Sequence, residues 1–118
     1  MSNRRKNTKL GAIVAETVFG DKFEYHPIFK DYNRPWVEDP IAFEPCPPYS
    51  TNIEHAWTVV EKLLTKLPNE DFHIEHWKAN ESSGWRVSTC FELGKWKDWV
   101  EAETLPMAIC KAALRAFA

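Results

Sequence analysis

Residues that could carry out acid–base chemistry lie between positions 73 and 92, where apolar residues alternate as they do in strands. Glu75 and Glu92 could face each other across neighbouring strands, with His73 and Arg86 close by. Two carboxylates and a histidine in such an arrangement can move protons during hydrolysis. Cross-strand ion pairs on a half-solvated sheet are much commoner, so a small hydrolase is the third of three functional hypotheses.

Metal and cysteine chemistry find little support in the sequence. His73 and His76 are three apart on a predicted strand, so their side chains point to opposite faces and cannot share one tetrahedral ion. The cysteines are Cys46, Cys90 and Cys110, without a Cys-x-x-Cys motif, which favours a reducing compartment without disulfides. Cys46, between two prolines, is the most exposed candidate, yet no sequence feature activates its thiol. We expect no metal, no cofactor and no catalytic residue.

The predicted strands also carry residue types that bind ligands. Trp77 and Arg86 fall on the face that alternates with the core row, where an indole can stack on a planar ring and a guanidinium can pair with a phosphate. The alternative is that the first helix and a Pro-rich segment cover this face, because a sandwich buries both faces of its sheet. The candidate ligand-binding residues are Trp77, Arg86, Lys97 and Trp99, with Trp36 or Tyr49 as a lid.

Composition narrows the class of protein. The chain has 118 residues, 44% hydrophobic content and a formal net charge of -2, which fits one domain (1–118) without global attraction to nucleic acid or anionic membranes. Its four glycines form no phosphate-binding loop, and the basic leader (1–8) is expected to be a flexible tail rather than a nucleic-acid module. The apolar residues that follow are too few for a signal peptide or a membrane span, so we expect a soluble, unsecreted protein.

Three helices are predicted to position these residues. The first repeats apolar residues from Leu10 to Val18, and Gly20 stands where a helix would end. The second runs from about 52 to 66, with Thr51 and Glu54 as a capping box, and the third from about 105 to 117. Thr104 is expected to cap the third helix. The predicted inward stripe of the second helix is Ile53, Ala56, Trp57, Val60, Leu63, Leu64 and Leu67.

Three strands are predicted between the second and third helices, at about 72–77, 85–93 and 96–102. The register of the last strand is ambiguous, because Trp96 and Trp99 both favour burial yet fall on opposite faces. The core row of the first two strands is Phe72, Ile74, Val87 and Phe91, expected to pack on the second helix.

The segment 21–48 fits none of these elements. Its six prolines exclude a long helix or a central strand, while its many aromatic and aliphatic residues are too apolar for a linker. We expect it to wrap on the core with one edge hairpin.

The chain resembles the phage ABA sandwich domain, a family of small phage and prophage proteins. The resemblance rests on the stretches 12–20, 49–63, 85–87 and 102–114, and leaves out the leader and residues 23–48. It implies a phage origin and an α-β-α sandwich, without an assigned activity. The expected fold is therefore α+β, with an antiparallel sheet of three or more strands in the order α, Pro-rich wrap, α, β, β, β, α, closed by the first helix and the wrap.

The function expected from this combination is non-catalytic binding. The first hypothesis is a counter-defence factor that sequesters a small nucleotide-like signalling ligand in the host cytoplasm, using the Trp77 and Arg86 face. The alternative is an inhibitor that blocks a host protein through an exposed apolar patch between Phe29 and Phe43. A homo-oligomer is compatible with either hypothesis.

Overall fold

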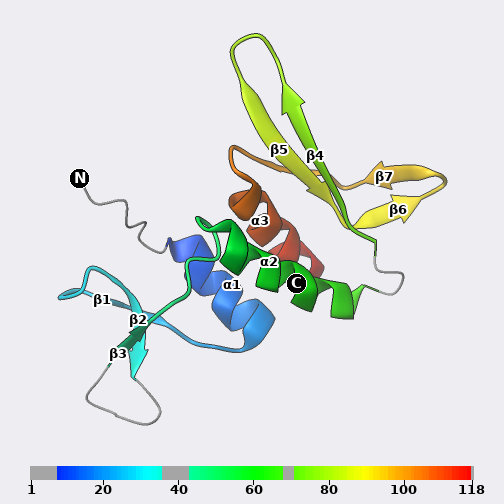
Figure 1. Ribbon diagram of the computed structural model, residues 1–118. Coiled ribbons are helices and arrows are strands. Elements are labelled where there is room, and N and C mark those ends of the chain that lie inside the picture. The colour runs from blue at the N-terminus through cyan, green and yellow to red at the C-terminus, as the bar shows by residue number, and fades with distance from the viewer. Residues whose placement is uncertain (1–7, 36–42, 68–70, 118) are drawn as a thin grey trace.

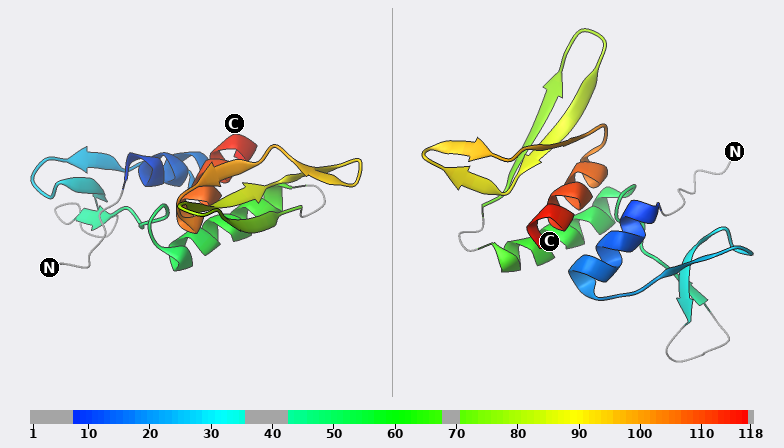
Figure 2. Two further views of the ribbon diagram at one scale, coloured as in Figure 1. Left: turned by 90° about the horizontal axis from the view of Figure 1, so that it is seen from above. Right: turned by 180° about the vertical axis from the view of Figure 1, so that it is seen from behind.

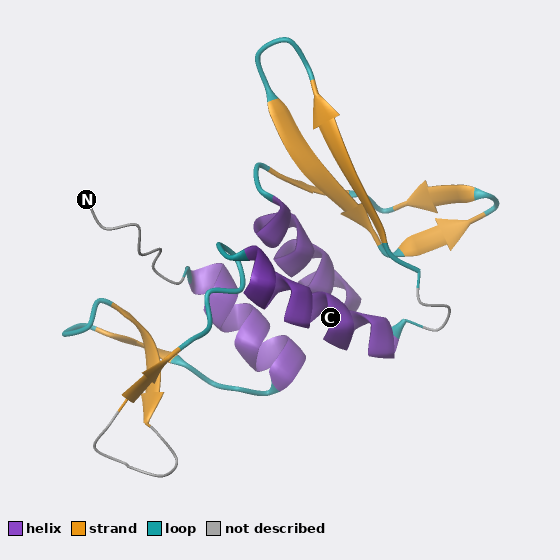
Figure 3. Cartoon of the chain, in the orientation of Figure 1, coloured by secondary structure: helices purple, strands orange, loops and turns teal. Residues whose placement is uncertain are grey.

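A computed structural model describes residues 8–35, 43–67 and 71–117. Within these ranges the chain forms three helices, which are α1 (Lys9–Phe19), α2 (Ile53–Lys66) and α3 (Leu105–Phe117). They lie side by side between two β regions, with β1 to β3 at one end and β4 to β8 at the other (Figure 1; Figure 3). None of the described helices is long and apolar enough to cross a membrane.

The ends of α1 confirm the predicted first helix. The Thr8 side chain accepts a hydrogen bond from the backbone N–H of Gly11 at 3.1 Å and so satisfies one donor that the first turn leaves unpaired. Gly20 follows the last turn with a φ of 75°, the left-handed conformation that glycine adopts without steric cost.

The predicted capping box of α2 is wrong by one residue. Asn52, not Thr51, is the N-cap, and its side-chain oxygen accepts from the N–H groups of Glu54 at 2.9 Å and His55 at 3.2 Å. An Asn amide immediately before the first helical residue reaches those donors directly. At α3 the predicted cap is confirmed, because the Thr104 hydroxyl accepts from the N–H of Met107 at 3.4 Å.

The inward stripe of α2 is also rotated from the prediction. Ile53 and Trp57 are 46% and 48% exposed, while the buried residues of the helix are Ala56, Val59, Val60 and Leu63. The reason is that α2 packs on α3 and α1 rather than flat on a sheet, so its buried face is centred on Val59 and Leu63.

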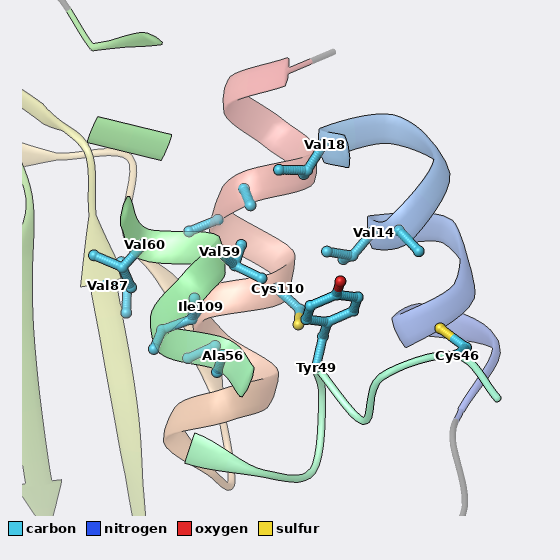
Figure 4. Close-up of a cluster of buried hydrophobic side chains, with 14 of the residues drawn as sticks. Val14, Val18, Cys46, Tyr49, Ala56, Val59, Val60, Val87, Ile109 and Cys110 are labelled. Atoms are coloured by element: carbon cyan, nitrogen blue, oxygen red, sulfur yellow. The ribbon is translucent and has the colours of Figure 1, made fainter. Parts of the chain in front are cut away.

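The core joins all three helices to one strand. Val14 and Val18 of α1 approach Val59 of α2 and Cys110 of α3 in Figure 4, and Val60 lies next to Val87 of the sheet. The aromatic ring of Tyr49 enters the same cluster from the loop before α2.

The second β region contains a sheet in the order β4-β5-β8, all antiparallel, formed by β4 (His73–Lys78), β5 (Ser83–Ser88) and β8 (Val100–Ala102). Its β5 and β8 strands pack on α3. A separate hairpin of β6 (Cys90–Glu92) and β7 (Lys95–Lys97) follows β5.

Two of the predicted strands are therefore each divided in two. The Ser88 hydroxyl accepts from the N–H of Cys90 and donates to the carbonyl of Lys97, which turns the chain away from the sheet after β5. Phe91 leaves the predicted core row and is 48% exposed. At the second break Asp98 has a φ of 55°, and this turn separates Trp96 on β7 from Trp99 before β8.

The Pro-rich segment forms a sheet instead of one edge hairpin. Its strands are β1 (Glu24–His26), β2 (Asp31–Pro35) and β3 (Phe43–Pro45), in the order β1-β2-β3. Two of these strands end at a proline, which cannot donate a ladder hydrogen bond. Cys46 follows β3, and its backbone N–H donates to the carbonyl of Tyr32.

The predicted α+β class is confirmed, with helices and several antiparallel sheets. The predicted closure of the sandwich by the first helix and the Pro-rich segment is wrong. Helix α1 packs on α3 and α2, and the β1-β2-β3 sheet lies beyond α1, at the end opposite the β4-β5-β8 sheet (Figure 2). This arrangement leaves one face of the β4-β5-β8 sheet turned away from the helices.

Candidate functional site

The outer face is our name for the side of β4-β5-β8 that bears His73, Glu75, Trp77 and Arg86. Strand alternation directs their neighbours Ile74, Trp85, Val87 and Val100 to the core, and Val87 is fully buried there. The side chains of Glu75 and Arg86 remain 38% and 33% exposed. The outer face is therefore accessible along its charged row.

Glu75 and Arg86 are direct register partners on β4 and β5. The Arg86 Nε donates to Glu75 Oε1 at 3.0 Å, and its Nη2 donates to the same oxygen. Hydrogen bonds from Arg86 lower the pKa of Glu75 from its ordinary value, with a smaller contribution from His73. The charge of Arg86 is thus already balanced, and an anionic ligand has to compete with Glu75 for it.

Two tryptophans extend this ion pair into an ordered array. The Arg86 guanidinium lies 4.5 Å from the centre of the Trp99 ring, a cation–π contact. His73 stacks on Trp96 with ring centres 5.0 Å apart, meets Trp99 edge-on at 5.4 Å, and holds Glu75 through Nε2 to Oε2 at 3.5 Å. Each member of the array has its orientation set by at least one other member.

Trp77 lies two residues after Glu75, at the next position of β4 on the outer face, and covers its register partner Gly84 of β5. A Cβ atom at Gly84 would stand 2.9 Å from Cζ2 of Trp77, so only glycine permits the indole to lie this close to the strand. The Nε1 atom of Trp77 is buried and has no hydrogen-bond partner within the described residues. One side of the indole therefore rests on the backbone.

The structure brings together three of the six predicted ligand-binding residues, namely Trp77, Arg86 and Trp99. Lys97 lies instead on β7, where its Nζ is 3.4 Å from Glu92 Oε2. Trp36 lies outside the described residues. Tyr49 as a lid is wrong, because it is 6% exposed in the helical core.

The contacts of Tyr49 explain its burial. Its ring stacks on Phe19 with centres 5.2 Å apart, and burial raises the pKa of its hydroxyl to about 12. Sequence reasoning also missed the part that Trp96 plays beside His73. The signal that was lacking is the turn at Asp98, which places Trp96 and Trp99 against one histidine ring although they are three residues apart.

The carboxylate pair proposed for hydrolysis is not formed across neighbouring strands. β4 carries Glu75 and pairs with β5, while Glu92 lies on the separate β6-β7 hairpin beside Lys97. Glu75 itself is engaged by Arg86. The geometry therefore gives the hydrolase hypothesis no support.

The expected exposure of Cys46 is wrong. Cys46 is buried, with 1% of its surface exposed, and its Sγ lies 3.4 Å from the carbonyl oxygen of Pro47. Burial raises the pKa of both Cys46 and Cys110 to about 12, which keeps the thiols protonated and unreactive. Among the described residues, no group of three or more His, Cys, Asp or Glu side chains could hold a metal ion.

A second candidate surface, the wing patch, consists of His26 of β1, Ile28 and Phe29 of the turn that follows β1, and Phe43 of β3. Ile28, Phe29 and Phe43 are 82%, 53% and 40% exposed. The rings of His26 and Phe29 are 4.6 Å apart, and each contacts Phe43, at 5.1 and 5.8 Å. His26, Phe29 and Phe43 thus form one connected cluster of rings, and the exposed Ile28 lies in the same turn as Phe29.

Arg34 of β2 holds the sheet that carries the wing patch. Its Nη1 is 2.9 Å from Asp21 Oδ1, and its Nε donates to Glu44 Oε1. The same guanidinium lies 4.7 Å from the centre of the buried Phe23 ring. These contacts tie β2 to β3 and to the segment that follows α1, and so provide a stable base for the patch.

Comparison with known proteins places the chain in a family. Residues 12–114 match the phage ABA sandwich domain, and the chain belongs to that family. The match identifies a phage protein and agrees with the α+β fold. Neither a curated protein nor a solved structure matches the chain.

Proposed function

We propose that this phage protein is a non-catalytic binding protein that obstructs a host protein through the wing patch. The observation that carries the proposal is the exposure of Ile28, Phe29 and Phe43 on the β1-β2-β3 sheet and its β1-β2 turn. Contiguous exposed apolar groups mark interaction sites, because leaving them in water costs free energy that a partner recovers by covering them. Aromatic anchors of this kind dominate the binding energy of many interfaces.

The phage family and the size of the chain favour a counter-defence role for such a binder. In this proposal the target is a host defence protein and the complex forms in the host cytoplasm. A second copy of the chain is the competing occupant of the patch, and the experiment below distinguishes the two.

The test is capture from host lysate with purified, tagged protein. We expect the wild type to retain a host protein and the double variant Ile28→Ser/Phe29→Ser to lose it. Leu93→Ser is the matched control, because Leu93 is 91% exposed on the β6-β7 turn, in the other β region. Retention of the host protein by the double variant would contradict the proposal. The proposal would also fail if the wild type captured no host protein and light scattering showed a dimer that the double variant, but not Leu93→Ser, abolished.

Sequestration of a nucleotide-like ligand on the outer face is a second candidate, favoured by the position of Trp77, Arg86 and Trp99 on one accessible surface. Binding of an anion requires Arg86 to exchange Glu75 for the ligand. Calorimetry against a panel of cyclic dinucleotides tests this candidate. Heat that Arg86→Ala abolishes would support it, and silence of the wild-type protein across the panel would remove it.

A further inference from the structure

A hollow of about 320 Å³ on the β1-β2-β3 sheet is lined in part by His26 and Phe43 of the wing patch. The register pairs Glu24 with Asn33 and Pro35 with Phe43, so the alternating residues of the three strands place these four side chains on one face. His26 shares that face and lines the hollow. Lys22 and Glu24 are largely exposed at its rim, where they pair at 3.8 Å.

The hollow contains one buried polar group. Asn33 is 9% exposed, and its Nδ2 donates to the backbone carbonyl of Asp31 at 3.1 Å. No other hydrogen bond of this amide is found within the described residues. An amide can make four hydrogen bonds, so the Oδ1 acceptor and the second Nδ2 hydrogen remain for a ligand.

The rings of His26 and Phe43 form an aromatic part of the wall of the hollow. The Nδ1 atom of His26 accepts from the backbone N–H groups of Ile28 at 3.3 Å and Phe29 at 3.5 Å. The His26 ring, oriented by these contacts, meets the Phe43 ring edge-on with ring centres 5.1 Å apart. The cation at the rim, Lys22, already pairs with Glu24.

From this combination we infer that the hollow binds a tyrosine side chain of the partner protein, an inference that rests on the proposed function. Sites for small ligands are usually about 300–1,000 Å³, so a hollow at the lower limit suits one ring rather than a nucleotide. The phenol ring packs on Phe43 and His26. Its hydroxyl donates to Asn33 Oδ1 and accepts from Nδ2, whereas a phenylalanine or leucine would leave the amide unsatisfied.

The test uses the isotope-labelled full chain in nuclear magnetic resonance titrations with three probes. These are p-cresol, which reproduces the tyrosine side chain, toluene, which lacks the hydroxyl, and 4-methylanisole, whose oxygen cannot donate. We expect p-cresol to shift the side-chain amide of Asn33 and the backbone signals of Glu24 and Phe43. Its affinity should exceed that of either control by about three- to tenfold, the value of one or two net hydrogen bonds.

The comparison of probes on the wild-type protein needs no substitution. As a second arm, Asn33→Leu should bring the affinities of p-cresol and toluene together. Equal affinities in the wild type, or shifts confined to other elements, would overturn the inference.

The capture experiment separates this inference from the proposed function. If the double variant loses its host partner and p-cresol does not shift Asn33, the tyrosine assignment fails and the proposed function survives. If p-cresol binds as expected but no host protein is captured, the selectivity of the hollow is supported and the proposed function fails.

Discussion

Arg86 determines what the outer face can bind. Its guanidinium donates to Glu75 and covers Trp99, so neither its charge nor its stacking surface is fully available to a ligand. Replacing the carboxylate should therefore strengthen the attraction of the face for anions, at the expense of a stabilising ion pair. The same pair makes part of the stability of the fold depend on pH.

The first prediction concerns that pH dependence. Because the folded state lowers the pKa of Glu75, the pair stabilises the protein above the unfolded-state pKa, and this contribution disappears as pH falls through the lowered value. Thermal melts of wild type and Glu75→Gln should differ at neutral pH and converge in acid. If the difference in melting temperature between the two proteins stayed constant from neutral to acidic pH, the ion pair would make no pH-dependent contribution to stability.

The second prediction concerns the indole on Gly84. The Cβ of Gly84→Ala would enter the space of Trp77, so the indole must move, at a cost of about 1–3 kcal/mol by analogy with overpacking. The fluorescence of Trp77 should shift at the same time. Ser83→Ala, at an exposed neighbouring position, is the control and should change neither quantity.

At the scale of elements, the end of α1 at Gly20 and the Thr104 cap of α3 could be predicted from sequence. The rotation of α2 could not, and neither could the central strand β2, since the prolines of segment 21–48 predict that it holds no central strand. Ile53 and Trp57 extend the apolar stripe of α2 beyond what its neighbours cover, so periodicity alone allows more than one buried face. Contacts with α3 and α1 select the face that contains Val59 and Leu63.

The candidate site on the outer face could also be predicted only in part. Strand alternation correctly placed Trp77 and Arg86 on one face, because that period depends only on local geometry. The contact of Arg86 with Trp99 depends on the turns at Ser88 and Asp98, which arise from side-chain hydrogen bonding and backbone conformation. Periodicity does not encode such turns.

The third prediction follows from the rotation of α2. Leu63→Ala removes a fully buried side chain and should cost about 2–5 kcal/mol of unfolding free energy. Trp57→Ala removes a larger but half-exposed side chain and should cost less than Leu63→Ala. Denaturant titrations of both variants measure the order, and a reversed order would restore the stripe predicted from sequence.

The fourth prediction concerns the cap of α2. Asn52→Ala leaves the N–H groups of Glu54 and His55 without their side-chain acceptor and should cost about 0.5–2 kcal/mol. Asn52→Asp retains an acceptor and should recover most of the loss. If the aspartate variant is as unstable as the alanine variant, the amide has another role than capping.

At the scale of the whole molecule, the helical layer separates the two candidate surfaces. The wing patch and the outer face lie in β regions at opposite ends of that layer (Figure 1; Figure 2). Each is supported by its own contacts, Arg34 with Asp21 and Glu44 on one side and Arg86 with Glu75 on the other. Distant substitutions without shared partners usually have additive effects.

The last prediction is therefore that the two surfaces act independently. Phe29→Ser should abolish capture of a host protein and leave the fluorescence of the outer-face tryptophans unchanged, while Arg86→Ala should have the opposite pattern. The combined variant should show the sum of the two changes in unfolding free energy, within about 0.5 kcal/mol. A change in unfolding free energy of the combined variant far from that sum would mean that the helical layer couples the two surfaces. Loss of capture in Arg86→Ala alone would mean that binding of the partner depends on both surfaces.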